Sequence, residues 1–439
     1  MKSPFNPDVV NMQRKRMISY DIFDKGSFLK KRLYLIRRQH KQTGQPVLIC
    51  LARMACNSLI SRFLGVIVPF FALFKIISTS ATPQATSTVA IRLSGGVGDV
   101  VNARFVIDNL IRRLNLNDTK IDVFYKNTAI CAAAFNTAPW INKTFNEARF
   151  SSLKNNYELV IDLTDYLSYE ITLPHSLIIR DNPELQKAIR HNKAEIKKFD
   201  FEIRHHPYLD NSLAVQAEKK ALNRLSLPLA FAHPQGAKFE ISSPQLFLTD
   251  KEQSILIRDR FSLTGKRYIT IHDGHDSCFG THTSQSTKQW SPENWQTLVR
   301  YISQFFPDIL IVQLGTKDSH PISGVSLNLA GQTTIAEAFA VLKNSMLHID
   351  GDSGMVRAAW IMGTQSVVMF GPTSANYYGL PGNINIQSES CHSCWWLDDN
   401  WMNQCPRKAK TPQCMQEIEP KFVFEQISKI LSIKNRKQQ

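Results

Sequence analysis

Two glycine-containing junctions, far apart in the chain, constrain its fold more than any other feature. Residues 89–100 and residues 348–359 each run from an apolar stretch through small residues into a stretch with helical spacing. A strand that turns directly into a helix presents the free amides of the helix N-terminus, which attract anions. The sequence therefore predicts two α/β halves, each with an anion site, and a cleft between them that holds a nucleotide-sugar.

The segments around the first junction alternate between the periods of strands and helices. Ile107, Leu110 and Leu114 follow one another at helical spacing, and two arginines come near the end of that stretch, as the helix dipole favours. Strands that alternate with helices form a parallel sheet with crossover connections. We expect strands at 89–93, 120–125, 158–163 and 176–180, and helices at 101–114 and 128–135.

The same alternation restarts after residues 181–248, a less regular segment punctuated by prolines. It predicts a second doubly wound unit. In this unit we expect a helix start at 248–252, strands at 267–272, 308–314, 326–329, 346–349 and 366–370, and helices at 292–306, 334–343 and 355–362. The predicted domains are an N-terminal extension (1–85), a first Rossmann-like domain (86–240) and a second one (241–439) with a cysteine-rich loop (391–414).

The positive charge of the chain is concentrated at its N-terminus. Residues 1–80 carry 14 Lys or Arg against three acidic residues, which accounts for +11 of the net +15. They include residues 63–74, a 12-residue apolar run interrupted by Pro69. A spanning helix needs about 20 residues, so this run is too short to cross a bilayer. It is either an amphipathic anchor on an anionic membrane surface or a core helix with a solvated basic face. Because no nucleic-acid recognition fold accompanies the basic residues, we expect no nucleic-acid partner.

Four of the eight cysteines gather near the C-terminus. Cys391, Cys394, Cys405 and Cys414 begin with a CxxC spacing. Such a set is typical of a structural zinc or iron site with four thiolate ligands. The alternative is a group of unligated thiols. A disulfide framework is not expected, since no secretion signal is visible.

Five segments of the chain, in this order, resemble glycosyltransferase family 9, the ADP-heptose:lipopolysaccharide heptosyltransferases. They are Arg92-Leu93 with Gly98-Asp99-Val100, residues 288–292, Leu329-Ala330-Gly331, Asp352-Ser353-Gly354 with Ala358-Ala359, and residues 370–373. The resemblance implies a GT-B fold, in which two Rossmann-like domains face a cleft. It also implies inverting sugar transfer without a metal ion, with the acceptor on the first domain and the nucleotide-sugar on the second.

The resemblance assigns roles to residues near the first junction and to a later loop. Asp99 matches the family's catalytic base, which takes a proton from the acceptor hydroxyl; the alternative is a plain helix cap. Gly98 beside it is a donor-binding candidate, because glycine lets the backbone approach a ligand closely. Lys288 matches the lysine that neutralises the leaving diphosphate. The hydroxyls of Thr283 and Ser284 match family hydroxyls that contact the phosphates of the nucleotide. The alternative for this segment is a polar surface loop.

The second junction supplies the remaining donor-binding candidates. Asp352, Ser353 and Gly354 match the family's phosphate-facing helix start, for which the alternative is again a simple cap. The family usually has histidine where this chain has Arg357. Arginine stays charged and is able to bind a diphosphate as a fork, but it cannot serve as a neutral acid or base. Because of this departure from the family pattern, the sequence does not identify the exact nucleotide-sugar donor.

These observations together predict a bacterial enzyme at the cytoplasmic face of the inner membrane. It is expected to move a heptose or related sugar from an ADP-heptose-like donor to a lipopolysaccharide or other cell-surface glycan precursor, without a cofactor for the chemistry. Two alternatives remain: a protein O-heptosyltransferase of the autotransporter type, or a catalytically inactive GT-B binding subunit.

Overall fold

The computed structural model describes residues 88–164, 167–173, 176–205, 222–239, 256–257, 260–275, 286–395 and 401–436, together with Pro46. The basic extension with its apolar run, the expected helix start at 248–252, and the candidate hydroxyls of Thr283 and Ser284 lie outside these residues. Within the described part of the chain, no helix combines the length and apolar character needed to cross a membrane.

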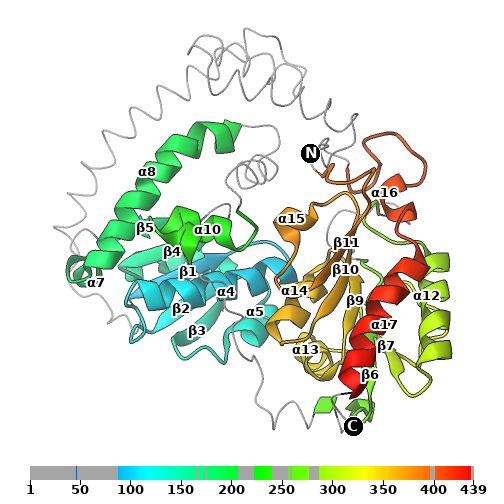
Figure 1. Ribbon diagram of the computed structural model, residues 1–439. Coiled ribbons are helices and arrows are strands. Elements are labelled where there is room, and N and C mark those ends of the chain that lie inside the picture. The colour runs from blue at the N-terminus through cyan, green and yellow to red at the C-terminus, as the bar shows by residue number, and fades with distance from the viewer. Residues whose placement is uncertain are drawn as a thin grey trace. The chain divides into compact units, whose positions relative to one another are not determined.

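The first sheet has five strands in the order β3-β2-β1-β4-β5 (Figure 1). Its central strand β1 is an almost continuous buried apolar run, as is typical of strands covered on both faces. Only β5 pairs antiparallel, at the sheet edge. The strands are β1 Val89–Leu93, β2 Ile121–Tyr125, β3 Ile141–Asn146, β4 Leu159–Leu163 and β5 Ser168–Ile171.

The helices of this half connect the strands or follow the last of them. They are α4 Val97–Arg113, α5 Thr128–Phe135, α6 Phe150–Leu153, α7 Leu177–Arg180, α8 Pro183–His205 and α10 Ser226–Ala232, with short 3₁₀ turns at Glu147–Arg149, Lys154–Asn156 and Gly236–Lys238. Helix α4 directly follows β1 and carries the first junction.

The second sheet has six parallel strands in the order β11-β10-β9-β6-β7-β8. They are β6 Tyr268–Ile271, β7 Leu310–Gln313, β8 Leu327–Asn328, β9 His348–Gly351, β10 Ser366–Phe370 and β11 Ile384–Gln387. The helices are α12 Pro292–Phe305, α13 Ile335–Asn344, α14 Gly354–Ile361, α15 Ala375–Tyr378, α16 Gln413–Gln416 and α17 Pro420–Arg436. The two predicted parallel-sheet α/β halves are confirmed, whereas the exact domain boundaries stay predictions.

One expected strand is wrong and several elements were not predicted. Residues 176–180 form helix α7, because the Ser176 hydroxyl accepts the N–H of Ile179 and caps a helix start. The segment predicted as irregular contains the long helix α8. Strand β3 escaped prediction because its residues are mixed in polarity and mostly half-buried.

Candidate functional site

The first junction folds as a tight turn closed by Asp99. Gly95 has a φ of +88°, which side chains disfavour, and a Cβ there would lie 2.3 Å from Oδ2 of Asp99. The backbone N–H of Gly96 donates to that oxygen over 2.9 Å. Asp99 therefore does cap the start of α4, where a carboxylate is electrostatically favoured. Its side chain remains 37% exposed, so capping leaves the carboxylate accessible.

The other oxygen of Asp99 is held by an arginine that was not among the predicted site residues. Arg224 precedes α10, and its Nη2 lies 2.9 Å from Oδ1 of Asp99. Burial lowers the pKa of Arg224, but electrostatic interactions with Tyr377, Asp99 and Tyr378 outweigh it, so that this pKa lies well above its ordinary value. No motif around residue 224 signals the contact, which joins positions 125 residues apart.

The second junction gathers three of the predicted donor-binding residues. Asp352 stands just before α14 and is 8% exposed. Its Oδ1 lies 3.1 Å from Nη2 of Arg357, and its Oδ2 lies 3.4 Å from Nζ of Lys288. Ser353 caps α14, because its hydroxyl accepts the N–H of Met355 over 3.0 Å. One carboxylate thus holds two cations beside a helix N-terminus.

Arg357 has an unused hydrogen-bond donor in a buried place. The residue is 4% exposed, and its Nη1 has no hydrogen-bond partner among the residues that the structure describes. Its guanidinium lies over the ring of Tyr378, 5.9 Å from the ring centroid. Leaving a buried charged donor unsatisfied is costly, and such a group calls for a functional explanation. An anionic oxygen of a ligand would satisfy it.

Glycines bring the two junctions into contact. A Cβ on Gly98 would lie 3.0 Å from Cα of Gly354 and 3.3 Å from Cγ of Arg357. A Cβ on Gly354 would in turn lie 3.0 Å from the backbone nitrogen of Gly98. The two helix starts can approach this closely only because both positions lack a side chain. The turn that carries Asp99 therefore lies next to the cluster of Asp352 and Arg357.

The cysteine-rich loop supports the segment that carries Lys288. The hydroxyl of Thr287 donates to the carbonyl of Trp401 over 2.7 Å, and the Thr287 N–H donates to the carbonyl of Met402 over 2.8 Å. These bonds hold the backbone next to Lys288. Sequence analysis did not predict this link, since it joins segments more than 100 residues apart.

The four thiols of the cysteine-rich loop are buried and form no disulfide. In the described segments, no three or more His, Cys, Asp or Glu residues are grouped so that they could hold a metal ion. A hydrogen bond with Cys414 lowers the pKa of Cys391 to about 6 against the effect of burial, with help from Arg407. The same bond, together with burial, raises the pKa of Cys414. Cys391 and Cys414 therefore interact in this structure, and a zinc or iron ion at the four thiols stays a prediction.

Behind Ser353 lies a buried network centred on Asp350. This aspartate is fully buried, accepts the hydroxyl of Ser353, and lies 3.1 Å from Nδ1 of His272 and 3.3 Å from Nε2 of His348. Burial raises the pKa of Asp350, but the charge and hydrogen bond of His272 and the bond of His348 lower it more, so that it lies well below its usual range. Asp350 therefore anchors the cap of α14.

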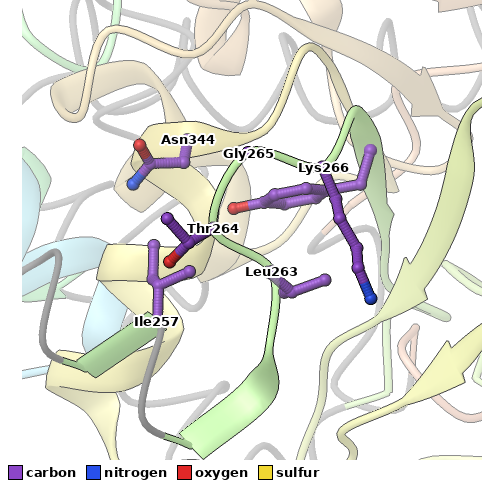
Figure 2. A pocket seen from close by; sticks show the side chains of 7 residues that line it. Ile257, Leu263, Thr264, Gly265, Lys266 and Asn344 are labelled. Atoms are coloured by element: carbon purple, nitrogen blue, oxygen red, sulfur yellow. The ribbon is translucent and has the colours of Figure 1, made fainter.

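A hollow lies at the amino end of β6, away from the predicted site residues near the carboxyl end of this strand. Its volume is about 150 Å³, and Tyr268 at the start of β6 lines it. The other lining residues are Ile257, Leu263, Thr264, Gly265, Lys266 and Asn344 (Figure 2). No predicted site residue lines it. Ligands of parallel sheets bind at the carboxyl ends of the strands, and this hollow lies at an amino end.

Comparison with known proteins decides the family. The profile of glycosyltransferase family 9 (heptosyltransferase) matches residues 147–395, more than half of the chain. The chain belongs to glycosyltransferase family 9. The resemblance read from the five segments is confirmed, and the chain is a family 9 glycosyltransferase. The matched residues include Lys288 and the Asp352–Arg357 cluster, whereas Asp99 lies before them.

Solved structures of family 9 members resemble this chain. The E. coli ADP-heptose lipopolysaccharide heptosyltransferase II is 16% identical, with a TM-score of 0.51 over 79% of this chain and 99% of that one. A Veillonella parvula family 9 protein (10%, TM-score 0.44) covers 80% and 99% of the two chains. The iron-containing dodecameric TibC of E. coli (12%, TM-score 0.45) covers 82% and 81%. None of the curated proteins matches significantly. The first likeness confirms the predicted GT-B fold.

Proposed function

We propose that this family 9 enzyme transfers a heptose or related sugar from a nucleoside diphosphate donor to a lipopolysaccharide or other cell-surface glycan precursor. The observation that carries the proposal is the buried, unsatisfied Nη1 of Arg357 beside Lys288 and the start of α14. A diphosphate is the anion that suits two cations and a helix N-terminus. The E. coli protein of similar fold is named for ADP-heptose, which makes an ADP-heptose-like donor the first choice.

On the donor side, Lys288 and Arg357 neutralise the charge that develops on the departing diphosphate. Ser353 and the amides at the start of α14, including that of Gly354, orient the phosphates. Asp352 keeps the two cations apart at fixed positions and faces a hydroxyl of the donor sugar. Two fixed cations supply charge that a divalent metal would otherwise supply, so the chemistry needs no metal ion. Thr283 and Ser284 add hydroxyl donors to the phosphates.

On the acceptor side, Asp99 is the general base. Its carboxylate takes the proton of the acceptor hydroxyl as that oxygen attacks the anomeric carbon, and the diphosphate leaves from the opposite face. A single displacement of this kind inverts the anomeric configuration. Gly98 keeps the turn of Asp99 close to Arg357, and therefore close to the reacting bond.

Replacing Lys288 with Ala is expected to weaken donor binding and to slow transfer. The loss removes one of two cations next to the diphosphate, and charge-assisted hydrogen bonds contribute about 1.5–3 kcal/mol, which corresponds to roughly a 10–150-fold weaker donor affinity. Titration calorimetry with the nucleoside diphosphate measures it. Lys421→Ala, which removes an exposed lysine of α17, is the control. Equal affinities in wild type and Lys288→Ala would remove Lys288 from the phosphate site.

The basic extension is proposed to bind the anionic surface of the inner membrane from the cytoplasmic side. Each basic residue near such a surface contributes about 1 kcal/mol, and salt weakens the attraction. Deleting residues 1–80 is expected to abolish co-sedimentation with anionic vesicles while nucleotide binding persists. Full-length protein should leave the vesicles at high salt. A deletion variant that cannot fold would instead make the extension part of the first domain's core.

The donor can be identified by thermal unfolding with a panel of nucleotide-sugars. A ligand at about 100 times its dissociation constant stabilises the folded state by about 2.7 kcal/mol, so the true donor should raise the melting temperature most. Incubation with lipid-linked glycan and with delipidated protein then separates lipopolysaccharide synthesis from protein heptosylation. Binding without transfer to either would identify an inactive GT-B subunit.

A further inference from the structure

We infer that Arg224 is a positioning residue for the catalytic base, an inference that rests on the proposed role of Asp99. The carboxylate is fixed at two points: Gly96 N–H donates to Oδ2 and Arg224 Nη2 donates to Oδ1, each over 2.9 Å. A carboxylate has about four lone-pair sites, so two remain for the acceptor hydroxyl. Two contacts on different oxygens prevent the group from rotating, and a single contact would not.

Arg224 can hold Asp99 because its own backbone is fixed from the other half of the molecule. Its N–H donates to the carbonyl of Tyr377 in α15 over 2.9 Å. The neighbouring Leu222 and Leu227 are buried in a cluster with Tyr377, Trp395 and Trp401. This cluster includes two tryptophans of the cysteine-rich loop, the same loop that supports the segment of Lys288. The segment of Arg224 and the segment of Lys288 are thus both supported by the cysteine-rich loop, the first through apolar packing and the second through backbone carbonyls.

The surroundings of Arg224 favour its charged form. The groups that face its guanidinium are the carboxylate of Asp99 and the rings of Tyr377 and Tyr378. Asp99 is the acidic group among them, and it accepts a charge-assisted hydrogen bond, which is directional and stronger than a neutral one. The pair therefore sets the direction of the Asp99 carboxylate.

Losing this contact should reduce turnover without affecting the donor. A catalytic group displaced by about 1 Å can cost about 10²-fold in rate. We expect Arg224→Gln to lower kcat by about 10–100-fold while KM for the nucleotide-sugar stays unchanged. Arg224→Lys keeps a cation and should recover part of kcat. Arg260→Gln is the matched control, since it breaks another arginine–carboxylate pair, with Glu337, away from the two junctions.

A double-mutant cycle tests the inference. In the Asp99→Asn background, the base is absent, so adding Arg224→Gln should cause no further loss of kcat. If the losses of kcat in the two single variants multiply in the double variant, the inference would be overturned. A kcat equal to wild type in Arg224→Gln would overturn it as well. If Arg224→Gln fails to fold, the cycle is measured with Arg224→Lys, which should lose less kcat by itself and should cause no further loss in the Asp99→Asn background. Full turnover in Asp99→Asn alone would overturn the proposed base, and the positioning role with it. If Asp99→Asn lowers kcat and Arg224→Gln does not, the positioning role of Arg224 would be overturned while the proposed base would stand.

Discussion

Replacing Asp99 with Asn is expected to reduce turnover by about 10²–10⁴-fold, the usual cost of removing a general base. The amide cannot take the proton of the acceptor hydroxyl. It has nearly the same size, and its carbonyl oxygen is still able to accept the N–H of Gly96 that closes the turn. Steady-state rates of sugar transfer with saturating donor and acceptor measure the loss.

Donor affinity separates a catalytic role of Asp99 from a structural one. Calorimetric binding of the nucleoside diphosphate should be the same in wild type and Asp99→Asn, because the proposed diphosphate contacts come from Lys288 and the second junction and not from the Asp99 side chain. Asp308→Asn, at an exposed turn, serves as a control and should leave both rate and affinity unchanged. Turnover close to wild type in Asp99→Asn would leave Asp99 as a helix cap without a part in catalysis.

Replacing Asp350 with Ala is expected to destabilise the protein by about 3–5 kcal/mol, the cost of breaking a buried charged network from one side. The substitution leaves His272, His348 and Ser353 buried without their shared partner. The shift of the denaturant midpoint measures the effect, with Asp308→Ala as the exposed control. A midpoint within error of wild type would show that the network does not stabilise the fold.

The pH dependence of this stability has a definite sign. The pKa of Asp350 is lowered in the folded state, so its ionised form stabilises the fold at any pH above the ordinary aspartate value of about 3.9. That contribution is lost as the pH falls toward the folded-state value. The stability difference between wild type and Asp350→Ala should therefore shrink in strong acid. A difference that grows as the pH falls below about 4 would contradict this assignment.

The sequence predicted those parts of the site that arise locally. Gly98, Asp99 and Ser353 could be placed at helix starts because a strand, small residues and a helical stretch follow one another without a break. The family resemblance then assigned both Lys288 and Asp352 to donor binding. Helix α7 was misread as a strand, since its few apolar residues have no period and only the cap of Ser176 reveals the helix.

Long-range contacts explain what was missed. Arg224 lies in a segment without a motif, and nothing in its neighbours indicates that it reaches Asp99. The bonds from Thr287 to the cysteine-rich loop, and the packing of Trp395 and Trp401, depend likewise on tertiary structure. Cysteine spacing likewise does not show whether the four thiols meet in a ligand geometry, so a metal ion at this loop stays a prediction.

The central claim is that the two junctions form the active site of an inverting heptosyltransferase. The most direct measurement gives the purified full-length protein ADP-heptose and a heptose-deficient lipopolysaccharide core glycolipid, with a chelator present, and analyses the product by NMR. We predict one ADP released for each sugar transferred, an inverted anomeric configuration, and no transfer by Asp99→Asn. Transfer with retained configuration, or equal transfer by Asp99→Asn, would contradict this account.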